Sequence, residues 1–288
     1  MKSLTAYTAA DWSRLRPLTH FMKTVRYRVV DRRYRRQSAP GGDLAALQRL
    51  IHGKRILVTV AFSDPQAIEW QARLVRHYVP HALYLIADNS PDDASASAIS
   101  EFAGRQGIPY LRLPKNPWHK GSRSHGIVMN WLWHNLIRPG EPEMFGFLDH
   151  DLFPTAPDDP FTGLANQDFY GVVRVAGSSW FLWAGFCFYR FTGVRHKKLD
   201  FGQDWFNGRD TGGGNWRSLY CVADRAALRE AAATYVPFKP GISVEDGPVQ
   251  WVGPWLHEVG MTGRPEFASE KRQFIATLLK EHLARVGS

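Results

Sequence analysis

Two aspartates separated by a single residue follow an apolar run near the middle of the 288-residue chain. The run covers residues 144–148, and Asp149-His150-Asp151 comes directly after it. Carboxylate oxygens placed in this way can bind one hard divalent cation, Mg²⁺ or Mn²⁺. A cation held there would neutralise the charge of a diphosphate. The sequence therefore predicts a metal site that serves a phosphorylated ligand.

Three earlier apolar runs also lead into polar residues, and helical periodicity separates one run from the next. The runs are residues 56–62, then Ser63 and Asp64; residues 82–87, then Asp88 and Asn89; and residues 108–113, then Lys115 and Asn116. Strands that alternate with helices are typical of a doubly wound parallel sheet. Ligands of such sheets bind beyond the carboxyl ends of the strands. We therefore expect the four polar strand ends to contribute to one site.

Two common phosphate-binding motifs do not occur in the sequence. The first apolar run is not followed by G-x-G-x-x-G, and the chain has no G-x-x-x-x-G-K-[ST]. These motifs bring backbone N–H groups close to the phosphates of a dinucleotide or a nucleoside triphosphate. A dinucleotide-dependent dehydrogenase is therefore disfavoured, and a P-loop enzyme is excluded.

The residues at these strand ends resemble those of the GT-A glycosyltransferases. The string from Phe147 to Asp151 is similar to their DxD motif, and residues 56–63 resemble the strand that contacts the nucleotide base. Asp88-Asn89-Ser90 resembles the acidic turn that binds the uracil or ribose. Asn116 with residues 121–126 is similar to the helix entrance of the family 2 type. The resemblance covers roughly residues 55–155.

This resemblance implies an α/β protein with a Rossmann-like GT-A fold: a mainly parallel central sheet, helices on both faces and a mixed C-terminal acceptor subdomain. Residues 1–50 would form a basic N-terminal helical extension, residues 51–155 the nucleotide-sugar-binding half, and residues 156–288 the acceptor and catalytic half with a C-terminal helix. The implied activity is metal-dependent transfer of a sugar from a nucleoside-diphosphate sugar to a hydroxyl acceptor, which would be a glycan, lipid-linked or a small molecule. Two alternatives stay open: a metal-dependent nucleotidyltransferase, which would release pyrophosphate, and a non-enzymatic nucleic-acid-binding protein.

Roles for individual residues follow from the same resemblance and from the neighbouring sequence. The metal, Mn²⁺ or Mg²⁺, would be bound by Asp149, Asp151 and a late histidine, His257. The nucleotide sugar would be bound by Phe62, Ser63, Asp64, Asp88, Asn89, Asn116, Lys120, Arg123, His150, Trp183 and Gly185. A general base would have to deprotonate the acceptor hydroxyl in an inverting reaction. Two aspartates are candidates for it: Asp210, which precedes a run of glycines, and Asp246 in Glu245-Asp246-Gly247.

The positive charge of the chain is concentrated near its N-terminus. The formal net charge is +9, and residues 21–36 contain seven basic residues and one acidic residue. Apolar residues recur at helical spacing from Leu18 to Val29, which predicts an amphipathic helix with a basic face. We expect peripheral contact with an anionic membrane through residues 21–36 and no specific binding of nucleic acid.

The sequence also bears on where the protein works. Its two cysteines, Cys187 and Cys221, are too few for a disulfide framework. No apolar run approaches the ~18 residues of a membrane span, and the first residues lack a signal-peptide pattern. We therefore expect a cytoplasmic protein that touches a membrane surface.

Overall fold

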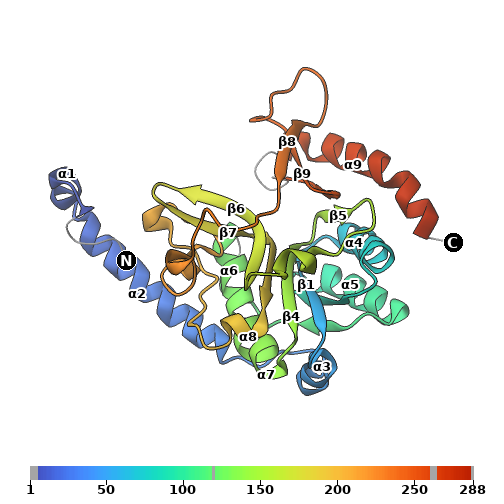
Figure 1. Ribbon diagram of the computed structural model, residues 1–288, viewed down its shortest axis with the longest axis horizontal. Coiled ribbons are helices and arrows are strands. Elements are labelled where there is room, and N and C mark those ends of the chain that lie inside the picture. The colour runs from blue at the N-terminus through green and yellow to red at the C-terminus, as the bar shows by residue number, and fades with distance from the viewer. Residues whose placement is uncertain (1–5, 119–120, 260–264, 287–288) are drawn as a thin grey trace.

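The computed structural model describes residues 6–118, 121–259 and 265–286, and the elements are labelled in Figure 1. The α-helices are α1 (Ala9–Ser13), α2 (Arg16–Arg35), α3 (Leu44–Ile51), α4 (Pro65–Tyr78), α5 (Asp93–Gln106), α6 (Gly121–Leu132), α7 (Arg138–Gly140), α8 (Phe191–Val194) and α9 (Pro265–Val286). The strands are β1 (Arg55–Ala61), β2 (Leu83–Asp88), β3 (Tyr110–Arg112), β4 (Met144–Asp149), β5 (Leu152–Pro154), β6 (Phe169–Ala176), β7 (Ser179–Arg190), β8 (Ala233–Pro237), β9 (Pro248–Val252) and β10 (Trp255–His257).

A six-stranded sheet with the order β3-β2-β1-β4-β7-β6 forms the centre of the molecule. Strand β1 pairs in parallel with β2 on one side and β4 on the other, so Val58 lies opposite both Leu85 and Phe147. Strand β7 runs antiparallel to β4, and β6 is antiparallel to β7. The predicted fold class, a mainly parallel α/β sheet, is confirmed.

The continuous apolar sequence of β1 is explained by burial on both faces. Ile56 and Val58 belong to a core shared with α3 and α6, whereas Leu57 belongs to a core shared with α4 and α5. Successive side chains of a strand point to opposite faces, so a strand covered on both sides needs apolar residues at nearly every position. Figure 1 shows the sheet between α6 and the pair formed by α4 and α5.

Local capping chemistry sets where two of the covering helices begin and end. The carboxylate of Asp64 accepts from the backbone N–H of Ala67 at the start of α4, and Asp92 does the same for Ser95 at the start of α5. Helix α5 ends at Gly107, whose φ of 61° lies in the left-handed region that glycine adopts without a steric cost. These caps place both helix starts beside the carboxyl ends of β1 and β2.

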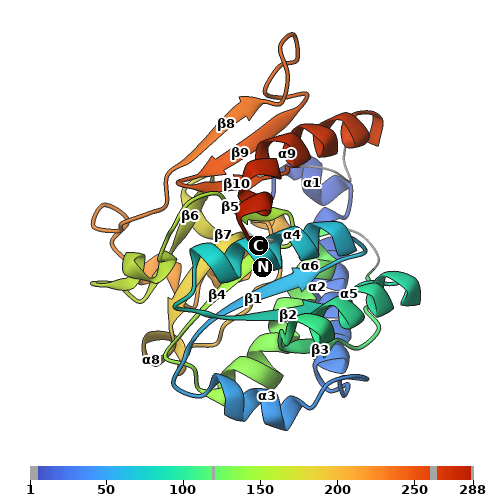
Figure 2. The same cartoon turned by 90° about the vertical axis from the view of Figure 1, so that its right-hand side faces the viewer.

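A second sheet, with the order β5-β10-β9-β8, is entirely antiparallel. Its core residues Trp255 and Leu256 pack in the same cluster as Ile275 and Leu279 of α9. Helix α9 also contacts α4, and Figure 2 shows it lying beside β9 and β10. This sheet brings β10 against β5, which follows the β4 turn.

The helical segment between β3 and β4 changes its geometry along its length. Residues 121–132 form α6, and the chain then makes a π-helical turn over Trp133–Ile137. The side chain of Asn135 donates hydrogen bonds to the carbonyls of Trp131 and Arg35, both at 3.0 Å. Asn135 thereby connects the π-helical turn to α6 and to the end of α2. The apolar residues from Ile127 to Leu136 are all buried.

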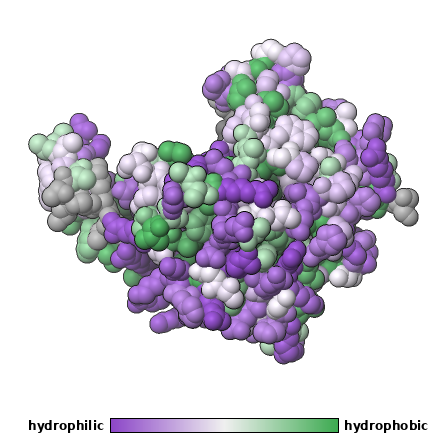
Figure 3. Space-filling view, viewed as in Figure 1, coloured by the Kyte–Doolittle hydropathy of each residue, from purple (hydrophilic) through white to green (hydrophobic). Residues whose placement is uncertain are grey.

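Helix α2 confirms the predicted N-terminal helix. Its regularly spaced apolar residues, however, face solvent and do not pack on the body of the protein. The face toward the body carries Tyr27, Asp31 and Tyr34, and the Tyr34 hydroxyl donates to the carbonyl of Pro114 at 3.0 Å. The apolar residues that recur at helical spacing point into solvent, with Met22 63% and Val29 61% exposed. Figure 3 shows the N-terminal end of α2 projecting from the body of the molecule.

Candidate active site

The turn after β4 is fixed by hydrogen bonds from a side chain of α4. The buried side-chain amide of Gln71 on α4 donates to the carbonyls of Asp149 at 2.6 Å and Leu152 at 2.7 Å. Its Oε1 accepts from the Tyr84 hydroxyl at 2.8 Å. Sequence reasoning missed Gln71, although one polar residue on the apolar face of a predicted helix was a signal for it. The backbone between the two aspartates is thus fixed before any ligand binds.

His257 meets the two aspartates because β10 pairs with β5. This register places His257 opposite Leu152, directly after the Asp-x-Asp turn. The His257 Nε2 atom lies 3.2 Å from Asp151 Oδ1 and 3.9 Å from Asp149 Oδ2. One ligand atom from each of the three side chains lies within 4.8 Å of the others. The structure therefore assembles the three predicted ligands from strands far apart in the sequence.

A buried amide orients the histidine. The Nδ1 atom of His257 is 2.9 Å from Gln250 Oε1, across the β9–β10 pair. An oxygen acceptor at Nδ1 leaves Nε2 directed at the carboxylates, which is how outer-shell groups orient metal-binding histidines. Two carboxylates and an imidazole form an oxygen-rich set suited to Mn²⁺ or Mg²⁺.

The charges within this group are strongly linked. Burial raises the pKa of Asp151, but the neighbouring His257 outweighs burial and holds the pKa of that carboxyl below its usual range. Burial lowers the pKa of His257, and the carboxylates of Asp151 and Asp149 more than reverse this, so the pKa of His257 is raised. The site therefore attracts a cation strongly enough to hold a proton on an imidazole that burial alone would leave neutral.

Predicted residues of β7 form one wall of the site. The centroids of the Trp183 and His257 rings are 4.7 Å apart, and the Arg174 guanidinium lies over the Trp183 ring, 5.5 Å from its centroid. A Cβ on Gly185 would lie 2.3 Å from both Asp149 Oδ2 and a carbon of the Trp183 ring. Gly185 thus leaves the space that Asp149 occupies.

A further histidine, His125 on α6, approaches the site from the opposite side. Its Nδ1 atom lies 3.5 Å from Asp149 Oδ1, and burial lowers its pKa. Its Nε2 atom is buried and has no hydrogen-bond partner among the described residues. His150, between the two aspartates, lies in the turn and is partly exposed.

An arginine of the C-terminal helix links the metal-binding turn to the end of β1. Arg272 on α9 donates to both carboxylate oxygens of Asp64, at 3.1 and 2.6 Å, and to Glu258 Oε1 at 3.1 Å. The buried Glu258 donates its own backbone N–H to the carbonyl of Asp151 at 3.0 Å. Burial raises the pKa of Glu258 to about 7 in spite of Arg272. Sequence reasoning missed both Arg272 and Glu258, since only the packing of α9 on α4 reveals the contact.

The ends of β2 and β3 form a pocket beside this group. Asn116 Nδ2 donates to Asn89 Oδ1 at 3.0 Å, and Asn89 Nδ2 donates to Ser124 Oγ at 3.1 Å. Phe62, Asn89 and Asn116 line the pocket, together with Ser90, Arg112 and Trp118. The predicted donor-binding residues of three strand ends therefore do meet.

Two predicted donor-binding residues, Asp88 and Ser63, make hydrogen bonds within the protein. The fully buried carboxylate of Asp88 accepts from the Tyr110 hydroxyl at 2.7 Å and from the backbone N–H of Ser90 at 2.8 Å. The Ser63 hydroxyl donates to Asp92 at 2.9 Å, and its backbone N–H donates to Ser90 Oγ at 2.9 Å. Together with Asp64, these side chains fix the positions of the loops that surround the pocket.

The remaining predicted residues lie at different distances from the metal-binding group. Asp210 accepts from Gln203 Nε2 at 2.7 Å, and its charge acts on His125. Asp246 lies in a turn of the β8–β9 connection, four residues before Gln250. Arg123 lies against Trp118, with its guanidinium carbon 5.5 Å from the ring centroid. Lys120 lies outside the described residues.

No protein-family model and no curated protein matches the sequence. Solved structures match part of it. The galactosyltransferase LgtC, in complex with donor and acceptor sugar analogues, is 14% identical over 49% of this chain and 59% of its own, with a TM-score of 0.36. The mannosyltransferase PcManGT from Pyrobaculum calidifontis, in complex with GDP-Man and Mn²⁺, is 12% identical over 60% of this chain and 54% of its own, with a TM-score of 0.37.

A third match is the glucosyl-3-phosphoglycerate synthase from Mycobacterium tuberculosis in complex with Mn²⁺ and UDP-glucose. It is 15% identical over 53% of this chain and 62% of its own, with a TM-score of 0.32. These are GT-A glycosyltransferases. The chain spans between 54% and 62% of the length of these three structures. The mainly parallel six-stranded sheet of this chain matches the GT-A fold.

Proposed function

We propose that the protein is a metal-dependent glycosyltransferase that moves a sugar from a nucleoside-diphosphate sugar to a hydroxyl acceptor. The observation that supports this most directly is the convergence of Asp149, Asp151 and His257 beside the pocket of Asn89 and Asn116. A bound Mn²⁺ or Mg²⁺ would stabilise the charge of the departing nucleoside diphosphate. The Asn116 to Asn89 hydrogen bond presents amide groups at the neighbouring strand ends, where a nucleoside would bind.

The predicted residues fall into three groups, which would bind the nucleoside, the diphosphate and the sugar of the donor. We assign the nucleoside to Phe62, Asn89 and Asn116, with Ser63, Asp64 and Asp88 supporting this pocket through the contacts described above. Lys120 and Arg123 would stabilise the leaving diphosphate. His150, Trp183 and Gly185 would contact the sugar, because they surround the two aspartates.

Asp210 is the favoured general base for the acceptor hydroxyl. It lies on the side of the metal-binding group where its charge reaches His125, and Gln203 fixes one carboxylate oxygen at 2.7 Å. Asp246 is the second candidate, and it would require an acceptor that extends to the β8–β9 connection. Replacing each aspartate by Asn distinguishes the two candidates. The variant that lacks the general base should lose transfer to the acceptor but still bind the donor and hydrolyse it slowly.

The function is tested by hydrolysis of UDP- and GDP-sugars without an acceptor. We expect turnover that needs Mn²⁺, is abolished by EDTA and falls at least 100-fold in Asp151→Asn. Asp168→Asn is the matched control, because this carboxylate is 52% exposed and its nearest ion-pair distance, to Arg190, is 4.0 Å. A nucleoside diphosphate as product supports a glycosyltransferase, whereas release of pyrophosphate would favour the nucleotidyltransferase. Unchanged turnover in Asp151→Asn would overturn the metal assignment.

We also propose that α2 rests on an anionic membrane. Leu18, Met22, Val25 and Val29 recur every three or four residues, and each is at least 43% exposed. The exposed basic residues Arg26, Arg32 and Arg33 lie on the same helix. Apolar residues flanked by cations are typical of helices that lie in the interface of an anionic bilayer. No helix among the described residues is long and apolar enough to cross one.

Vesicle binding tests this contact. The wild type should sediment with vesicles that contain an anionic lipid and much less with neutral ones, and Met22→Glu with Val29→Glu should weaken the binding at least tenfold. Equal sedimentation of the variant would overturn the proposal.

We place the protein in the cytoplasm, because both cysteines are unpaired and Cys221 is exposed, which suits a reducing compartment.

A further inference from the structure

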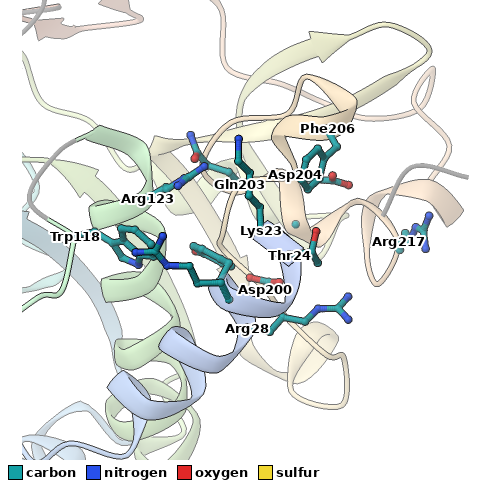
Figure 4. A pocket seen from close by; sticks show the side chains of 13 residues that line it. Lys23, Thr24, Arg28, Trp118, Arg123, Asp200, Gln203, Asp204, Phe206 and Arg217 are labelled. Atoms are coloured by element: carbon teal, nitrogen blue, oxygen red, sulfur yellow. The ribbon is translucent and has the colours of Figure 1, made fainter. Parts of the chain in front are cut away.

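A second pocket, of about 220 Å³, lies between α2, α6 and the segment from residue 200 to 217 (Figure 4). It is lined by Lys23, Thr24, Arg26, Tyr27, Arg28, Trp118, Arg123, Asp200, Gln203, Asp204, Phe206, Gly214 and Arg217. Figure 4 shows Lys23, Arg123 and Gln203 extending toward the same space from α2, α6 and the loop. The pocket is therefore built by three segments that are distant in the sequence.

The lining of this pocket carries an excess of positive charge. Five of its side chains are cationic and two are acidic. Both acids have donors within the protein: Asp204 accepts from Arg209 at 2.6 Å, and Asp200 accepts from Asn130 at 2.9 Å. Cations gathered in a concave site raise the local concentration of anions. The pocket is suited to an anionic group.

Trp118 separates this basic pocket from the pocket of Asn89 and Asn116, because it lines both. The guanidinium carbons of Arg26 and Arg123 each lie 5.5 Å from its ring centroid. Its indole Nε1 and the Tyr27 hydroxyl are buried without a hydrogen-bond partner among the described residues. Buried polar groups without a partner destabilise a fold, so oxygen acceptors in this wall would stabilise it.

The basic pocket also lies close to the proposed reaction centre. The charge of Asp210 acts on His125, and His125 Nδ1 lies 3.5 Å from Asp149 Oδ1. Gln203, which lines the pocket, binds Asp210. A ligand in this pocket would thus reach the metal-binding group from the side opposite the nucleoside.

We propose that the basic pocket binds a phosphate group carried by the acceptor, an inference that rests on the proposed glycosyl transfer. Arg and Lys side chains form strong charge-assisted hydrogen bonds with phosphate oxygens. The phosphate would belong either to a polyprenyl phosphate or to a soluble sugar phosphate. In both cases the nucleoside of the donor occupies one side of Trp118 and the acceptor's phosphate the other, and Arg123 lies between the acceptor's phosphate and the donor's diphosphate.

Binding of inorganic pyrophosphate in EDTA tests the proposal without relying on turnover. Lys23→Gln with Arg26→Gln removes two charges that line the pocket. Arg32→Gln with Arg33→Gln removes two exposed charges from the same helix outside it. Calorimetry should show at least a tenfold loss of pyrophosphate affinity in the first double variant and affinity within twofold of the wild type in the second. Equal affinity in all three proteins, or an equal loss in both variants, would overturn the proposal.

Displacement of the bound pyrophosphate identifies the source of the phosphate. Hexose phosphate in solution and polyprenyl phosphate in detergent micelles are compared, with empty micelles as the control. Displacement by one of them assigns the acceptor class, and displacement by neither would also overturn the proposal. Acceptor-free donor hydrolysis, measured in parallel, should be equal in all three proteins. If none of them hydrolyses a donor, the proposed function fails, but the pyrophosphate result still decides the pocket.

Discussion

Gln250 Oε1 lies 2.9 Å from Nδ1 of His257, across the β9–β10 pair, and this contact directs the opposite ring nitrogen at Asp151. Gln250 is fully buried, so bulk water cannot take the place of its side chain as the hydrogen-bond partner of His257. The geometry of the proposed metal site therefore depends on a residue that would never touch the metal.

Replacing Gln250 by Leu should weaken Mn²⁺ binding 10- to 100-fold, the usual effect of removing an outer-shell partner from a metal-binding histidine. Titration with Mn²⁺, followed by thermal unfolding, measures it. Gln250→Glu keeps an oxygen acceptor for Nδ1 and should retain most of the affinity. Equal Mn²⁺ affinity in Gln250→Leu and the wild type would show that the histidine is oriented by other contacts.

Gly185→Ala should displace Asp149, because the added Cβ would lie 2.3 Å from Asp149 Oδ2. We expect at least a tenfold loss of Mn²⁺ affinity while the chain still folds. Gly104→Ala on α5 is the control: no atom lies within 4 Å of its added Cβ, and alanine should stabilise the helix by roughly 0.5–1 kcal/mol. Full Mn²⁺ affinity in Gly185→Ala would contradict the prediction.

Gln71→Leu should lower the free energy of unfolding by about 2–4 kcal/mol, because it strips the carbonyls of Asp149 and Leu152 of a buried donor. Tyr84→Phe removes the hydroxyl that donates to Gln71 Oε1 but leaves the donor to both carbonyls in place, and it should cost about 1 kcal/mol. Urea denaturation of both variants gives the two values. A smaller loss in Gln71→Leu than in Tyr84→Phe would mean that the turn is held mainly by other groups.

Stability should depend on pH through His134, which is half-buried. Burial, then Arg35 and Arg138, lower the pKa of His134 to about 4 from its ordinary value of 6.5. Between these two pH values the unfolded chain binds a proton that the folded protein does not, so stability falls as the pH falls from 6.5 to 4. Above this window the residue contributes no pH dependence.

Comparison with His134→Gln isolates this effect from that of the carboxylates. Urea denaturation at pH 7 and pH 4.5 should show a loss about 1–2 kcal/mol larger in the wild type than in the variant, after allowance for partial exposure. An identical loss in both proteins would exclude His134 as its source.

The sequence by itself determined the α/β class and the set of strand ends at the site. Apolar periodicity and capping residues are local properties, so β1, α4 and β2 were visible as an alternation, and Asp149 and Asp151 stood out behind a buried run. Because parallel strands of one sheet share an edge, a local pattern was enough to predict that Asn89 and Asn116 would approach this site.

Only the tertiary structure decided which polar residues are engaged inside the protein. Asp64 was visible as a polar strand end, but its pairing with Arg272 depends on α9 packing against α4, some two hundred residues later. The outward direction of the apolar residues of α2 likewise depends on Tyr27 and Tyr34 docking on the body. Hydrophobic spacing shows that a helix has two faces, whereas long-range contacts determine which face is buried.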